Sequence, residues 1–147
     1  MLKGPLIHPQ ILSALGRAGH GSKVLLSDGN YPHATKRGRH AEVVYLNLAP
    51  GQLSVTEVLG PLLQAISVEA AAVMAPQREG PYAMQGDPPI FAEFDAMLTT
   101  AGFDQPLDRL ERFDFYTAAA ADDVALTIAT GEQRIYANLL LTIGVVQ

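Results

Sequence analysis

The chain has 147 residues and a formal net charge of −5; 48% of its residues are hydrophobic and only 17% are charged. This length predicts a single domain over residues 1–147, and the negative charge argues against nucleic acid and against an anionic membrane surface as partners. The sequence contains no cysteine, which excludes disulfides and thiolate metal sites.

The low charge content also predicts association. A small chain with so few charges often buries apolar surface between subunits, so we expect a homo-oligomer. The first residues lack the apolar stretch of a secretion signal, and no apolar run reaches membrane-spanning length. We therefore expect a cytoplasmic protein.

The first third of the chain predicts a helix, a short strand and a long polar loop. Residues 9–19 carry apolar side chains at helical spacing, and Gly19 is expected to end this helix with a positive φ just before His20. Residues 23–27 are a short apolar run, typical of a strand buried on both faces. Residues 30–40 are polar and rich in cations, and two interpretations stay open: a solvated surface loop or a lid over a pocket.

Hydrophobic periodicity predicts strands that alternate with helices over most of the chain, which is typical of an α/β fold. A capping box, Ser54-x-x-Glu57, marks the start of one helix, and Pro61 is expected either to kink that helix or to displace its start. Near the end, two strands flank a tight turn at residues 130–132, which suggests an antiparallel pair that closes the sheet. Further strands are expected at residues 42–48, 69–75, 107–110, 124–129 and 135–146, helices at 54–67, 88–100 and 112–121, and a loop rich in glycine and proline at 77–89.

His20 and Asp28 are the first candidates for functional groups. Imidazole titrates near neutral pH and can both give and take a proton, and the glycines beside His20 let the backbone approach a ligand. Alternatively, His20 compensates the dipole at the end of the first helix. Asp28 follows a strand at the kind of position where ligands of open α/β sheets gather, or it only initiates a turn. The two residues are expected at opposite ends of one short strand.

Arg112, Tyr136 and Asn138 are further candidates. Arg112 lies next to aromatic residues and can hydrogen-bond a polyol, or it is an exposed charge at a helix start. Tyr136 and Asn138 are two residues apart, so on a strand they would share one face, either as a polar site or as an edge strand that faces water. The histidines lack metal-ligand spacing, and no glycine-rich nucleotide motif occurs, so neither a metal nor a nucleotide is expected.

Three segments together resemble the D-ribose pyranase and L-fucose mutarotase family, and are closer to its fucose branch. They are AGHGSKVLLSDGNYP at residues 18–32, RFDFYTAAA at residues 112–120 and TGEQRIYANLLLTIGVV at residues 130–146. The resemblance implies a layered α/β/α domain with a mixed, mostly parallel central sheet. It further implies ring-shaped oligomers, commonly decamers, with sites where neighbouring subunits meet, and interconversion of the ring forms of a monosaccharide without any cofactor.

The resemblance also implies roles for individual residues. His20 matches the family's proton donor, and Asp28 and Arg112 match sugar-binding residues, as does the run Tyr136, Ala137 and Asn138. The chain departs from the family at Ala137, where glycine is common, and at Asn30, where fucose-type members often carry histidine. It also departs in its cation-rich loop at residues 32–39. A positive φ at Ala137 would cost about 1 kcal/mol, and these departures concern the identity of the sugar more than the chemistry.

We therefore predict a monosaccharide mutarotase in which His20 is the acid/base. Tyr136, or a water that it holds, is the weaker candidate for the counterpart, while Asp28, Arg112 and Asn138 orient sugar hydroxyls. One alternative is a non-catalytic sugar-binding or transport-accessory module, which needs the same binding residues but not His20. The other is a structural oligomer without a small ligand.

Overall fold

The computed structural model describes residues 1–146 and is built on one six-stranded sheet. Its strands are β1 (Lys23–Ser27), β2 (Glu42–Tyr45), β3 (Val68–Met74), β4 (Asp108–Leu110), β5 (Val124–Ala129) and β6 (Leu139–Ile143). They lie in the order β2-β5-β1-β6-β3-β4. Only β6 runs against its neighbours β1 and β3, while the other pairs are parallel. The sheet is therefore mixed and mostly parallel, as predicted, and five strands end at the same edge.

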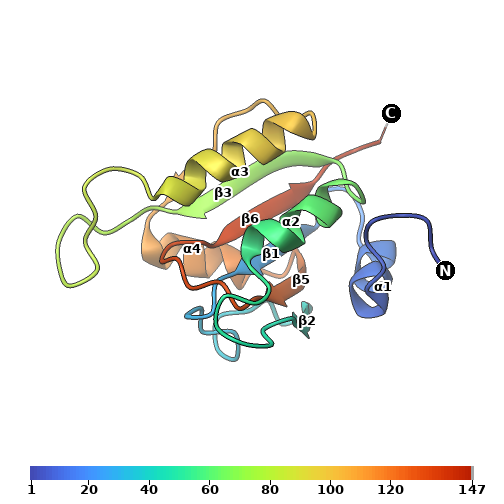
Figure 1. Cartoon of the computed structure of the whole chain (residues 1–147), viewed down its shortest axis with the longest axis horizontal. Helices are drawn as coiled ribbons and strands as arrows, with labels where there is room; N and C mark the ends of the chain where they lie inside the picture. Colours follow the sequence, from blue (N-terminus) through green and yellow to red (C-terminus); the bar gives the residue numbers. More distant parts are fainter. Residues whose placement is uncertain (147) are drawn as a thin grey trace.

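Helices cover both faces of this sheet. They are α1 (Pro9–Arg17), α2 (Val55–Leu63), α3 (Pro89–Thr100) and α4 (Arg112–Ala119). Figure 1 shows α2 and α3 in front of the sheet and α4 behind it, while α1 packs against β2 and β5. This arrangement confirms the layered α/β fold. None of the helices within residues 1–146 has the length and apolarity needed to cross a bilayer.

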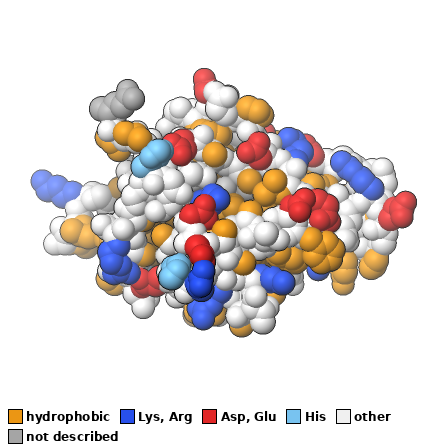
Figure 2. Space-filling view, turned by 180° about the vertical axis from the view of Figure 1, so that it is seen from behind, with side chains coloured by type: hydrophobic (Ala, Val, Ile, Leu, Met, Phe, Trp, Pro, Cys, Tyr) orange, Lys and Arg blue, Asp and Glu red, His pale blue; other side chains and the backbone are white. Residues whose placement is uncertain are grey.

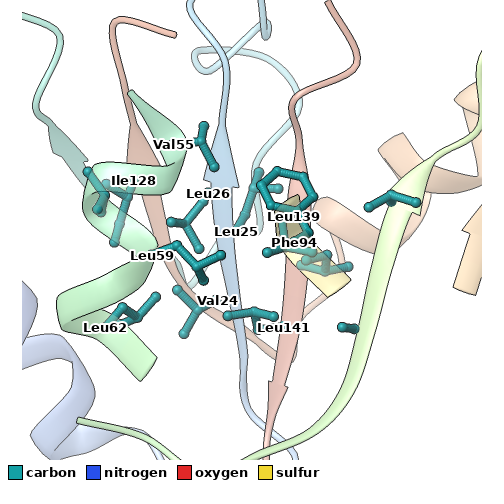
Figure 3. Packing of buried hydrophobic residues seen from close by; sticks show 14 of the residues in the cluster. Val24, Leu25, Leu26, Val55, Leu59, Leu62, Phe94, Ile128, Leu139 and Leu141 are labelled. Atoms are coloured by element: carbon teal, nitrogen blue, oxygen red, sulfur yellow. The ribbon is translucent and has the colours of Figure 1, made fainter. Parts of the chain in front are cut away.

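The core lies where α2 packs on the central strands. The apolar side chains of β1 are fully buried, which agrees with a strand covered on both faces and placed between β5 and β6. Figure 3 shows Leu59 and Leu62 of α2 next to Leu26 and Val24 of β1. These contacts fix β1 firmly, and with it the position of the loop that follows its carboxyl end.

The predicted capping box at the start of α2 is confirmed. The Ser54 hydroxyl accepts from the Glu57 N–H at 3.3 Å, and the Glu57 carboxylate accepts from the Ser54 N–H at 2.7 Å. Pro61 lies inside the helix and does not displace its start. The helix ends at Leu63, earlier than predicted, and Gln64 is its C-cap.

The predicted end of the first helix is wrong in detail. Ala18, in an extended conformation, is the C-cap, and the helix ends before it. The positive φ of 80° occurs at Gly21, after His20, rather than at Gly19. The chain reverses there because Gly21 tolerates a left-handed backbone, and its N–H donates to the Ile143 carbonyl at 2.9 Å.

The predicted antiparallel pair at the end of the chain is also wrong. β6 pairs with β1 and β3 and not with β5, so it lies inside the sheet rather than at an edge. Residues 130–138 therefore cross the sheet edge instead of forming a hairpin turn. Tyr136 and Asn138 precede β6. The prediction that they share one face of a strand is therefore wrong.

Candidate functional site

A pocket of about 320 Å³ opens at the edge where the five parallel strands end. Parallel strands present their carboxyl ends together, and β6 begins at this same edge, so segments far apart in sequence meet there. The volume is within the usual range for small-molecule sites. Four predicted site residues line it: Asp28, Arg112, Tyr136 and Asn138.

Asp28 and Asn138 form the polar floor of the pocket. The Asn138 amide donates to the Asp28 carboxylate at 2.9 Å and accepts from the Asp28 N–H at 3.0 Å, although the residues are 110 positions apart. Asp28 is only 3% exposed and Asn138 only 4%. Burial raises the pKa of Asp28, while hydrogen bonds from the Asn30 backbone and the Asn138 side chain oppose that rise. The carboxyl group is thereby held in one orientation toward the pocket.

Tyr136 has its hydroxyl engaged by the loop that follows β3. The hydroxyl accepts from the Gln77 N–H at 3.1 Å and donates to the Tyr82 carbonyl at 2.9 Å. The hydroxyl of Tyr136 therefore acts as both donor and acceptor within the protein. These two hydrogen bonds hold the loop of residues 75–88 at the pocket, and we call them the latch. Tyr136 is also the residue with positive φ, at 62°, so Ala137 does not carry the backbone cost expected for it.

An aromatic wall faces this polar floor, and it was not predicted from the sequence. Tyr116 lines the pocket, with the Arg112 guanidinium carbon 5.6 Å from its ring centroid. Tyr31 packs edge-on against Tyr116 at 5.7 Å and donates to the Lys36 carbonyl at 2.7 Å. Burial raises the pKa of Tyr31. Tyr116 follows Arg112 by four residues, so helical spacing on one face would have identified it.

His20 lies outside the pocket of its own chain. It precedes β1 at the opposite edge of the sheet, and the five residues of β1 span roughly 16 Å. Its Nε2 is 2.8 Å from a carboxylate oxygen of Glu69, and the side chains of His20 and Glu69 are 60% and 40% exposed. The prediction that His20 and Asp28 lie at opposite ends of one strand is confirmed. The structure does not bring His20 and Asp28 together within one chain.

The remaining histidines offer no metal centre in the described part of the chain. No group of three or more His, Asp or Glu side chains among residues 1–146 is arranged to hold a metal ion. His33 instead donates or accepts a hydrogen bond with the buried Ser27 hydroxyl at 2.8 Å, and burial lowers the pKa of His33.

Comparisons with known proteins agree with this geometry. A sequence model of the RbsD / FucU transport protein family matches residues 1–146. The chain is 32% identical to the fucose mutarotase of Bos taurus, covering 99% of this chain and 94% of that protein. It is 30% identical to the L-fucose mutarotase of Haemophilus influenzae, covering 99% and 97%. The crystal structure of the Streptococcus pneumoniae fucose mutarotase in complex with L-fucose has a TM-score of 0.81 at 25% identity, covering 100% of both chains.

Proposed function

Because this chain belongs to the RbsD / FucU transport protein family, we propose that it is a mutarotase that interconverts the anomers of a free monosaccharide. One observation carries the proposal: a buried carboxyl–amide pair, Asp28 and Asn138, faces a pocket that also contains Arg112. Sugars need several directional hydrogen bonds in a small concave site, and these three side chains supply acceptors and donors at fixed positions.

The reaction needs a proton carrier. The ring oxygen of a hemiacetal leaves only when it gains a proton, and the anomeric hydroxyl loses one as the C1–O5 bond breaks. The open-chain aldehyde then rotates about one bond and closes to give the other anomer. A positioned acid or base contributes typically 10²–10⁴-fold to such a step, and His20 is the residue that we assign to this role.

We place His20 in the pocket of a neighbouring copy of the chain. Within one chain it lies at the far edge of the sheet, and its side chain is 60% exposed and so open to a second subunit. Glu69 supports the assignment, because a carboxylate that accepts from Nε2–H fixes the imidazole tautomer and leaves Nδ1 to exchange a proton. Tyr136, whose hydroxyl is engaged by the loop, and Tyr116 are the candidates for the counterpart of His20.

The assembly belongs to the same proposal. The resemblance to the D-ribose pyranase and L-fucose mutarotase family implies a ring of ten copies. Such a ring would bring each pocket against the edge of a neighbouring sheet that carries His20. The substrate would be a neutral sugar such as L-fucose, or D-ribose if pyranose forms are also handled. Light scattering measures the number of subunits, and cell fractionation tests the cytoplasmic location that we expect.

Saturation-transfer NMR on L-fucose and D-ribose tests the activity. The protein should accelerate anomer exchange, and the His20→Asn and Asp28→Asn variants should not. Co-expressing the two variants tests the shared site, because about a quarter of randomly assembled interfaces would combine an intact pocket with an intact His20. Exchange at the uncatalysed rate for every sugar would contradict the proposal.

The second candidate is a non-catalytic sugar-binding module. It is favoured by the separation of His20 from the pocket within one chain and by the filled hydrogen-bonding roles of Tyr136. Calorimetric binding of a sugar without any accelerated exchange would support this candidate. Recovery of exchange in the co-expressed variants would exclude it.

A further inference from the structure

The tyrosines that line the pocket differ in how their hydroxyl groups are engaged. They are Tyr31, Tyr82, Tyr116 and Tyr136. Tyr31 donates its proton to the Lys36 carbonyl at 2.7 Å, and Tyr136 donates its proton to the Tyr82 carbonyl at 2.9 Å. Tyr82 is 64% exposed, so its side chain is open to water. Tyr116 is half-buried, and its O–H finds no acceptor among residues 1–146, so its proton is available to a ligand in the pocket.

The ring of Tyr116 is held in place by its neighbours. Tyr31 packs edge-on against it with the centroids 5.7 Å apart, and Phe113 packs edge-on at 6.5 Å. The guanidinium carbon of Arg112 lies 5.6 Å from the centroid of the same ring. Edge-to-face and cation–π contacts of this kind are favourable and depend on orientation. The phenol is therefore oriented at the aromatic wall before a sugar binds.

The charge beside Tyr116 is that of Arg112. Hydrogen bonding and charge interaction with Tyr116 raise the pKa of Arg112. Arg112 forms no salt bridge with any carboxylate of residues 1–146, so no acidic side chain neutralises it there. Figure 2, seen from the side of α4, shows basic and acidic side chains next to one another, so no broad charged field is added on this face. A fixed guanidinium stabilises the negative charge that develops on the phenol oxygen as the proton leaves.

We propose that Tyr116 is the second acid/base residue of the site, and that it protonates the ring oxygen while His20 of a neighbouring copy takes the proton of the anomeric hydroxyl. As the C1–O5 bond breaks, its electron pair goes to O5, which gains the Tyr116 proton. The O1–H electron pair forms the C1=O1 bond, and that proton passes to Nδ1 of His20. Closure on the other face of the aldehyde returns both protons. The inference rests on the proposed mutarotase function and assigns this role to Tyr116 rather than to Tyr136.

Saturation-transfer NMR on L-fucose tests the assignment. Tyr116→Phe should lower kcat for anomer exchange by about 10²–10⁴-fold, because it removes the proton and keeps the ring. Calorimetry should show that the affinity for L-fucose falls by less than about tenfold, the effect of one lost hydrogen bond. Tyr45→Phe is the matched control and should keep the wild-type kcat, since Tyr45 is 60% exposed on β2 and does not line the pocket.

Replacing Tyr116 with 3-fluorotyrosine separates proton transfer from a packing role. The fluorine makes the phenol more acidic and changes the size of the ring little. If the phenol donates a proton in the reaction, the fall of kcat at alkaline pH should therefore move to lower pH. A tyrosine that only packs against the sugar would leave this pH profile unchanged.

The outcomes separate the two levels of the proposal. A large loss of kcat in Tyr116→Phe together with a shifted profile in the fluorinated protein supports the inference. Accelerated exchange at the wild-type rate in Tyr116→Phe, or an unchanged profile in the fluorinated protein, overturns the inference and keeps the mutarotase function. Loss of exchange in Tyr136→Phe but not in Tyr116→Phe also overturns it. A wild-type protein that accelerates exchange of no sugar overturns the mutarotase function and the inference with it.

Discussion

The two edges of the central sheet differ in how they hold their polar groups. At the carboxyl edge, Asp28 and Asn138 are almost completely buried and are joined by two hydrogen bonds. At the opposite edge, His20 and Glu69 form a single contact of 2.8 Å between side chains that are 60% and 40% exposed. The first edge carries the residues to which we assign sugar binding. The second presents outward the imidazole to which we assign proton transfer.

This difference suggests that the buried edge binds the sugar and that the exposed edge transfers the proton. A buried carboxyl–amide pair orients hydroxyls well, because neither partner can be rearranged without leaving a polar group unsatisfied. An exposed imidazole retains access to solvent and can exchange its proton after each turnover. Separate variants at the two edges should therefore affect separate steps.

The largest effect is expected at the exposed edge. His20→Asn should lower the rate of anomer exchange by roughly 10²–10⁴-fold, because it removes the proposed proton carrier. Sugar affinity should change little, and the free energy of unfolding should change by less than about 0.5 kcal/mol, because the side chain is exposed. Calorimetry and chemical denaturation give these two quantities. His40→Asn is the control, as His40 is also exposed and lies in the loop before β2.

The opposite pattern is expected at the buried edge. Asp28→Ala leaves the Asn138 amide and the Asn30 N–H without their acceptor, which should cost about 1–3 kcal/mol of unfolding free energy. Sugar affinity should fall together with stability. If Asp28→Ala keeps full affinity and only slows exchange, the separation between a binding edge and a proton-transfer edge is wrong.

The sequence predicted the features that depend on nearby residues. The apolar run of β1, the capping box of α2 and the bounds of β5 follow from periodicity and short-range hydrogen bonding, and all three are confirmed. The position of Asp28 at the end of a buried strand follows from the same patterns. These features need no knowledge of the strand order.

The features that the sequence analysis missed depend on long-range pairing. The insertion of β6 between β1 and β3 decides that Asn138 meets Asp28, and no local pattern encodes that choice. The Glu69 partner of His20 lies 49 residues away on β3. Because β5 and β6 do not form the predicted hairpin, Tyr136 and Asn138 lie in the pocket and not on an edge strand.

A smaller effect is expected from the latch over the pocket. Tyr136→Phe removes the hydroxyl that joins the Gln77 N–H to the Tyr82 carbonyl, so residues 75–88 should open more often. Hydrogen exchange in this loop should accelerate by an amount that corresponds to about 1 kcal/mol. Tyr82→Phe is a matched control, because only the backbone of Tyr82 takes part in the latch. Equal acceleration in both variants would show that the hydroxyl does not hold the loop.

The smallest effect is the pH dependence of stability, which differs in sign between a buried and an exposed carboxyl group. Burial raises the pKa of Asp28, so the folded protein favours the neutral carboxylic acid at this position. The contribution of Asp28 to the unfolding free energy is therefore complete below the pKa of the unfolded chain, about 4. This contribution is lost as the pH rises through the raised pKa of the folded protein. The unfolding free energy of wild type relative to Asp28→Asn should therefore decrease from pH 4 upward. Glu57 has a lowered pKa because it accepts from the Ser54 N–H, so its contribution is lost as the pH falls. In the same denaturation series, the unfolding free energy of wild type relative to Glu57→Gln should increase from low pH upward. If this difference and the one measured with Asp28→Asn change with pH in the same direction, the Asp28 carboxyl is solvated rather than buried in the pocket.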